Sequence, residues 1–262
     1  MTRVFSAVVL LAVLVGAVWF LPPVTTLALA LIVAALAFLE YATIADALGA
    51  RLPRIVSGAA VLAACAAVGG SYVPADIVIM TAVVSIGALA VGSGQPGPAI
   101  LRDTAASVFP IVYIGLPLGA LAAVRVVGGR GAVLLLVVCI VVSDSAQYYT
   151  GRALGRRPLA PSISPKKTLE GALGGLVFGT AAMLAGGRIV FPAAGLLILL
   201  LVGASISALG IVGDLFESLL KRSAGVKDSS SLIPGHGGVL DRIDSWLFAA
   251  PVYYVFVRYL QF

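Results

Sequence analysis

The chain has 262 residues, of which 61% are hydrophobic and 11% charged, with a formal net charge of +6 and a mean hydropathy of +1.12. A soluble domain of this length has too little interior to bury so much apolar surface. The composition therefore excludes an ordinary soluble domain and indicates a protein whose solvent is lipid.

Apolar runs recur along the whole chain, and most reach the 17 to 25 residues, roughly, that a bilayer-spanning helix needs. They predict an all-α, polytopic integral membrane protein with about nine transmembrane helices. The runs are Val4–Leu21, Val24–Leu39, Ile55–Val68, Ala75–Val91, Thr104–Val127, Gly131–Tyr149, Leu169–Ala185, Ile189–Gly213 and Trp246–Phe262. The first run lacks a small-x-small cleavage site and ends at Pro22, so it is predicted to be a retained helix rather than a signal peptide.

Lys and Arg are retained on the cytoplasmic side of membrane proteins. With nine spans, thirteen of the 17 basic residues share one side with the N-terminus, which is therefore predicted to be cytoplasmic. In this orientation Asp144, Asp214, Asp241 and Asp244 lie toward the cytoplasmic ends of their spans. We expect these acids to converge at one depth with the basic pair that begins at Lys166.

Two regions are predicted from the distribution of polar residues. Residues 1–127 form an N-terminal transmembrane scaffold of about five helices, and residues 128–262 form a catalytic transmembrane region of about four. The catalytic region contains the cytoplasmic loops 150–168 and 214–245.

The N-terminal scaffold carries few candidates for chemistry. Arg51, Arg54 and Arg102 are interpreted as topology determinants or contacts to anionic lipid, with substrate binding as the alternative. Cys65 and Cys139 fall inside predicted spans, where a thiol behaves as a small hydrophobic group. No disulfide framework or cysteine metal site is expected.

Asp144 lies well inside its apolar run. An acid at that depth costs several kcal/mol unless it is paired, hydrated or bound to a cation, and so it is a candidate functional residue. A structural salt bridge to a neighbouring helix is the alternative.

The loop 150–168 ends in two lysines and two hydroxyl residues, Ser164, Lys166, Lys167 and Thr168, just before a predicted helix. Ammonium groups and the unpaired N–H groups of a helix start both suit a phosphate. Positive-inside topology alone is the alternative. No Walker-type sequence occurs, so a nucleotide is not expected to be held by a P-loop.

Gly171, Gly175 and Gly179 recur every four residues in the following span. Small residues at this spacing predict a face on which another helix packs closely.

The segment 213–245 contains five of the 11 acids, four of the 17 basic residues and the only histidine, His236. Asp214, Glu217 and Lys221 are spaced to share one face of a helix. Carboxylates combined with phosphates and water are the usual environment of Mg²⁺.

The role of His236 is left open between contacting substrate, ordering its glycine-rich loop and a purely structural role. Zinc is not expected because no cysteine or second histidine lies near it. Clustered acids for a metal and clustered bases for phosphate indicate phosphoryl or nucleotidyl transfer.

The sequence from about residue 140 to 246 resembles the phosphatidate cytidylyltransferases, integral-membrane enzymes that make CDP-diacylglycerol. The matching positions are Asp144, Ser145, Tyr148, Gly151, Arg152, Ser164 to Thr168, Glu170, Gly171, Ser218, Lys221, Arg222, Lys227, Asp228, Pro234, His236 to Gly238, Asp241, Arg242 and Asp244. One departure is Gln147, where the family more often carries alanine.

The resemblance implies transfer of CMP from CTP to phosphatidic acid in phospholipid biosynthesis, with Mg²⁺ and a second cation, K⁺. It implies catalytic roles for Asp144, Asp214, Asp241 and Lys167, with the three aspartates as metal ligands. Substrate contacts are expected from Ser164, Lys166, Lys167, Thr168, Lys221, Arg222, Lys227, His236 and Arg242. It also implies a homodimer in the inner membrane, with an active site that faces the cytoplasm and no nucleic acid partner.

Three alternatives remain from the sequence. A related lipid cytidylyltransferase, such as an archaeal ether-lipid enzyme, or a polyprenol kinase would use another acceptor or nucleotide. A cation transporter would use Asp144 and Asp214 to bind the carried ion, but it leaves the basic loops unexplained.

Overall fold

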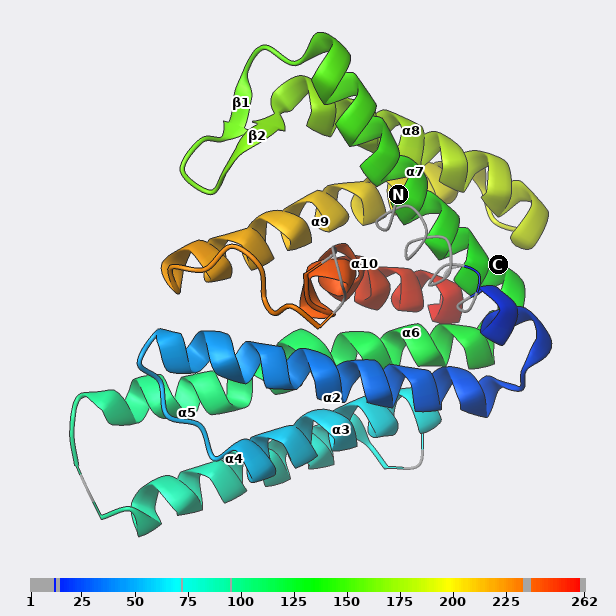
Figure 1. Ribbon diagram of the computed structural model, residues 1–262. Coiled ribbons are helices and arrows are strands. Elements are labelled where there is room, and N and C mark those ends of the chain that lie inside the picture. Colours follow the sequence, from blue (N-terminus) through cyan, green and yellow to red (C-terminus); the bar gives the residue numbers. More distant parts are fainter. Residues whose placement is uncertain (1–11, 13–14, 72, 95, 233–236, 260–262) are drawn as a thin grey trace. The chain divides into compact units, whose positions relative to one another are not determined.

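The computed structural model describes residues 12, 15–71, 73–94, 96–232 and 237–259, and they are overwhelmingly helical. The elements are α2 (Pro23–Ala47), α3 (Arg54–Gly70), α4 (Ala75–Gly92), α5 (Ala99–Pro110), η1 (Ile111–Gly115), α6 (Leu116–Val127), α7 (Gly129–Leu154), β1 (Pro158–Ala160), β2 (Ser164–Thr168), α8 (Leu169–Val190), α9 (Leu196–Ser223) and α10 (Leu240–Tyr259) (Figure 1). The predicted span Val4–Leu21 falls mostly outside the described residues, and His236 also lies outside them.

Within the described residues, six helical segments are long and apolar enough to cross a membrane. They are α2, α4, the continuous segment Ala99–Val127, α7, α8 and α9. The shorter α3 is apolar over 17 residues, and α10 has 20 residues with charges near both ends. The chain is therefore an all-α, multi-pass membrane protein, as predicted.

One predicted span was wrong in its boundaries. Instead of running from Ile189 to Gly213, the chain ends α8 at Val190 and starts α9 at Leu196, which continues to Ser223. Pro192 explains the break, because a residue that precedes proline is disfavoured in the helical region. The intervening residues are apolar, so hydropathy alone did not reveal the break.

Both predicted loops are more ordered than the sequence indicated. Thr150 to Leu154 continue α7, and β1 pairs with β2 in an antiparallel hairpin that joins α7 to α8. The second loop, predicted over residues 214–245, is reduced at both ends, since α9 runs to Ser223 and α10 begins at Leu240.

The first compact unit contains residues 1–123 and 220–242. Its helices α2, α3 and α4 run beside one another (Figure 1). Small residues allow this close packing: Ala64 and Cys65 are completely buried, and a Cβ added at Gly119 would lie 2.7 Å from the carbonyl oxygen of Cys65. Cys139, in the other unit, is also buried, so both thiols lie where the sequence predicted.

The segment Ala99–Val127 contains a local irregularity at Pro110. Proline has no N–H to donate to the helical ladder. The next five residues, Ile111–Gly115, form a π-helical turn before the α-helix resumes as α6. The span that was predicted from Thr104 therefore begins earlier, at Ala99, and is interrupted near its middle.

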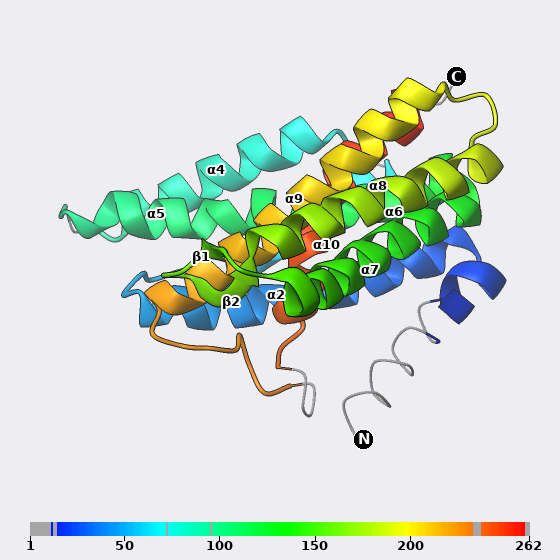
Figure 2. The same cartoon turned by 90° about the horizontal axis from the view of Figure 1, so that it is seen from above.

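The second compact unit contains residues 124–219 and 243–262. Helices α7 and α8 lie side by side along their length (Figures 1 and 2). A Cβ added at Gly175 would overlap the Gln147 side chain and lie 3.0 Å from the carbonyl oxygen of Ser143, and a Cβ at Gly179 would overlap Ser207 of α9. The glycine face predicted from the four-residue spacing is confirmed.

We expect Gly175→Val to destabilise this helix pair, because the added side chain overlaps α7. Overpacking of this kind costs about 1–3 kcal/mol. The thermal unfolding midpoint in detergent measures the effect. Gly87→Ala is the control, since a Cβ at this helical position meets nothing within 4 Å. Equal midpoints for the two variants would contradict the packing role.

Candidate active site

Lys167 and Asp214 form an ion pair in the second unit, with side chains that are 22% and 34% exposed. Lys167 is carried by β2, and the hairpin is held by Glu170, which accepts hydrogen bonds from the backbone N–H groups of Arg156 and Arg157 at 3.0 and 3.2 Å. Thr168 caps α8 by accepting from Gly171 N at 3.1 Å. The sequence of this loop thus orders the segment that presents Lys167.

Two more acids interact with this pair. Asp144 interacts electrostatically with Asp214 and Lys167, and Asp244 interacts with all three residues. Gln147, the departure from the family pattern, donates a hydrogen bond to Asp144 at 3.1 Å. The second unit therefore brings together Asp144, Asp214, Asp244 and Lys167 from four separate elements, as expected. Asp241, which was expected to converge with them, belongs to the first unit.

Three carboxylates with one ammonium group leave an excess of negative charge that favours a cation. Carboxylate oxygens are ligands that Mg²⁺ prefers, and Mg²⁺ in enzymes often takes only one or two carboxylates, with phosphates and water completing its shell. In the part of the chain that the structure describes, no group of three or more His, Cys, Asp or Glu side chains could hold a metal ion by itself. The donor set fits Mg²⁺ that is bound together with a phosphate ligand.

A second ion pair, Lys221 with Asp241, lies in the first unit and is nearly buried, with side chains that are 10% and 6% exposed. The other carboxylate oxygen of Asp241, Oδ2, accepts from Ser229 N at 2.9 Å, Ser229 Oγ at 2.8 Å and Gly238 N at 2.7 Å. Burial raises the pKa of Asp241, but hydrogen bonds from Lys221, Gly238 and Ser229 outweigh it and lower the pKa from 3.8 to about 2.

This lowered pKa predicts an acid-dependent loss of stability. The ionised Asp241 stabilises the fold fully above the ordinary pKa of 3.8, and the contribution is lost as the pH falls through the folded pKa of about 2. The ordinary pKa of aspartate is about 4. Below about this pH, the unfolding midpoint of the wild type in detergent should therefore fall more steeply than that of Asp241→Asn. Parallel pH profiles for the two proteins would contradict this result.

The other predicted substrate contacts are arranged more openly. Lys166, Arg222, Lys227 and Arg242 are exposed, and Ser164 is partly exposed. Arg222 donates to the carbonyl of Val226 at 3.3 Å, which closes the turn after α9.

Glu40 is a buried acid next to Asp241 and its partners that the sequence analysis did not identify. It lies in α2, is only 6% exposed and accepts hydrogen bonds from four groups in the segment that leads into α10. The predicted apolar run ends at Leu39, so the sequence places Glu40 at its boundary and gives no sign of its distant partners.

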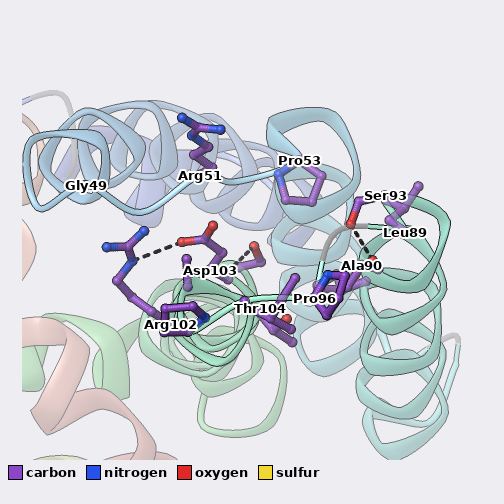
Figure 3. A pocket seen from close by; sticks show the side chains of 16 residues that line it. Gly49, Arg51, Pro53, Leu89, Ala90, Ser93, Pro96, Arg102, Asp103 and Thr104 are labelled. Carbon is purple, nitrogen blue, oxygen red and sulfur yellow. Dashed lines mark hydrogen bonds and ion pairs between the residues drawn. The ribbon is translucent and has the colours of Figure 1, made fainter.

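A cavity of about 550 Å³ lies in the first unit beside Arg51 and Arg102 (Figure 3). Arg102 pairs with Asp103 at 3.0 Å, and apolar residues including Ile86 and Leu89 line the remaining wall. A second cavity, of about 480 Å³, is lined by Leu36, Leu39, Glu40 and residues 229–232. Arg51 and Arg102 therefore line a cavity that has both charged and apolar walls.

Membrane-spanning helices and two ion pairs between lysines and carboxylates define a class: a multi-pass membrane protein with charged sites among its helices. The cytidylyltransferase family matches residues 1–260, and the chain belongs to this family.

Several curated proteins are similar to this chain. The phosphatidate cytidylyltransferase of Helicobacter pylori strain J99 is 37% identical over 190 residues, which are 72% of this chain and 67% of that protein. The phosphatidate cytidylyltransferase of Haemophilus influenzae is 50% identical over 138 residues, 48% of this chain and 46% of that protein. The uncharacterized protein YnbB of Escherichia coli is 47% identical over 132 residues, 50% of this chain and 44% of that protein. The chain thus spans between 44% and 67% of the length of these relatives.

Proposed function

We propose that this protein is a phosphatidate cytidylyltransferase that transfers CMP from CTP to phosphatidic acid and releases pyrophosphate. The names of its relatives support the reaction and both substrates. The observation that carries the proposal is the Lys167–Asp214 ion pair with Asp144 and Asp244 beside it, since it combines a phosphate-binding cation with carboxylates for a metal.

In the proposed reaction, a phosphate oxygen of phosphatidic acid bonds to the α-phosphorus of CTP. The bond from that phosphorus to the bridging oxygen of the β-phosphate breaks, and pyrophosphate leaves with the electron pair. Lys167 is proposed to neutralise the phosphates as charge moves to the leaving group. Ser164, Lys166, Thr168, Lys221, Arg222, Lys227, His236 and Arg242 are proposed as further contacts to the substrates.

Asp144 and Asp214 are proposed to hold Mg²⁺. Asp241, in the first unit, is proposed as a cation ligand because the family resemblance implies that role. Bound Mg²⁺ would neutralise phosphate charge and orient the nucleotide. K⁺ is proposed as a second cation. The carboxylates themselves would keep the cation and the Lys167 ammonium at the same phosphate group.

Nine transmembrane helices with a cytoplasmic N-terminus are proposed for the topology. Support comes from the distribution of Lys and Arg along the sequence. This orientation opens the active site to the cytoplasm, where CTP is available, in the inner membrane of a bacterium. We propose a homodimer, whose mass can be measured by light scattering with correction for bound detergent.

Purified protein in detergent is tested with α-labelled CTP, phosphatidic acid and Mg²⁺. Label should enter a chloroform-extractable product, and equal amounts of pyrophosphate should form. Omission of Mg²⁺ should abolish the product.

Reactions with other phospholipids, polyprenols or ATP test the related enzymes. Folded protein that labels only one of these alternative acceptors would overturn the choice of phosphatidic acid. Cation flux in vesicles without nucleotide turnover would favour a transporter instead.

A further inference from the structure

Glu40 accepts hydrogen bonds from two backbone N–H groups and two serine hydroxyls, all within the first compact unit. Oε1 accepts from Ser230 Oγ at 2.6 Å and Val239 N at 2.9 Å. Oε2 accepts from Leu240 N at 2.7 Å and lies 2.9 Å from Ser229 Oγ. An acid buried in an apolar helix that is long enough to cross a membrane requires such partners to offset its desolvation.

The Glu40 carboxylate accepts these hydrogen bonds at the start of α10. The first N–H groups of a helix have no partner within the helix, and the partial positive charge there favours an anion. Glu40 takes the N–H groups of Val239 and Leu240, and Asp241 takes those of Gly238 and Ser229. Two carboxylates thus share the polar groups of Ser229, Ser230 and the backbone at the start of α10.

Ser229 connects these carboxylates. Its hydroxyl oxygen lies 2.9 Å from Glu40 Oε2 and 2.8 Å from Asp241 Oδ2. A hydroxyl has one proton to donate, so it is shared between the two acids. The position of Asp241 therefore depends on that of Ser229, which Glu40 helps to fix.

We propose that Glu40 is a positioning residue, which holds Ser229 and Ser230 against the start of α10 and so fixes the orientation of Asp241. The role of Asp241 rests on the proposed function, but the positioning of its carboxylate does not. Glu40 is not a catalytic residue in this proposal, because it acts on Asp241 only through Ser229 and the first residues of α10.

The main test compares the wild type with Glu40→Gln. The glutamine amide has one acceptor oxygen and one donor NH₂ group. Whichever way it points, one backbone N–H, of Val239 or of Leu240, faces the NH₂ group and loses its acceptor, and the serine hydroxyl beside it must turn to accept instead of donate. Hydrogen exchange in peptides covering residues 224–242 should become about tenfold faster, while peptides from α3 and α7 keep their wild-type rates.

Two further variants sharpen the comparison. Ser229→Ala removes only the shared hydroxyl and should give a smaller increase in exchange in the same peptides. Asp46→Asn is the matched control, because it removes the same charge from the same helix but affects an exposed ion pair with Arg54. It should leave exchange in the turn unchanged.

The Mg²⁺ dependence of CMP transfer provides the functional readout. In Glu40→Gln the Mg²⁺ concentration for half-maximal rate should rise about fivefold, because the loss of a backbone hydrogen bond at the start of α10 loosens Asp241, and most of the rate should return at saturating Mg²⁺. A general loss of folded protein would not be rescued in this way.

Unchanged exchange in the turn for both Glu40→Gln and Ser229→Ala would overturn the proposal. So would exchange that rises equally in α3 and α7, or a wild-type Mg²⁺ dependence in both variants. Exchange is measured without substrate, so it decides the positioning role even if the wild type transfers no CMP, a result that would overturn the proposed function instead.

Discussion

Asp214→Asn is expected to reduce the rate of CMP transfer by about a thousandfold, since losing a ligand worth several kcal/mol in the transition state has an effect of this size. The amide keeps the shape of the side chain but removes the charge that pairs with Lys167. It also lowers the total negative charge around Lys167, to which Asp144 and Asp244 contribute.

The rate is measured from α-labelled CTP over a series of Mg²⁺ concentrations. Ser218→Ala is a useful comparison, because Ser218 lies one turn away and makes only a long hydrogen bond to Asp214, at 3.5 Å. This variant should lose less than about tenfold, the cost of one modest hydrogen bond. If Asp214→Asn retained a tenth of the wild-type rate, Asp214 would not be a metal ligand.

Gly238→Ala is expected to have the second large effect. A Cβ at this position would overlap Ser229 Oγ and lie within 2.5 Å of Glu40 Oε1, so the turn has no room for a methyl group. The variant should lose about 1–3 kcal/mol of stability. Its rate of CMP transfer should fall about a hundredfold at limiting Mg²⁺, because displacement of the turn also moves Asp241.

Gly92→Ala is the control, since a Cβ there meets nothing within 4 Å. A double-mutant cycle with Glu40→Ala adds a sharper test. Truncating Glu40 removes the carboxylate that the new methyl group meets, so Gly238→Ala should cost less in that background than in the wild type. Additive losses of stability would contradict the contact between Gly238 and Glu40.

Much of the fold was readable from apolar periodicity and glycine spacing. The helices α4 and α7 lie close to the predicted runs, and the glycine face of α8 packs as expected. These features are local, because length, hydropathy and a four-residue spacing determine them. The errors came where a local interruption lies within apolar sequence, as at Pro192 and Pro110.

The candidate site was predicted in part for the same reason. Charges in an apolar chain stand out, so Asp144, Lys167 and Asp214 were identified before the structure placed them together. The ion-pair partner of each residue was harder to predict. The pairing of Lys167 with Asp214, and of Lys221 with Asp241, depends on elements that meet only in the folded chain.

The sequence by itself determined the membrane class, the helical architecture and the residue types of a phosphate and metal site, because composition and spacing carry that information. Only the tertiary structure assigned a role to Glu40, whose partners lie 189 to 200 residues away along the chain. An isolated acid at the end of an apolar run has many possible explanations in sequence. Hydrogen bonds from a distant turn, formed only on folding, distinguish a positioning residue from a boundary charge.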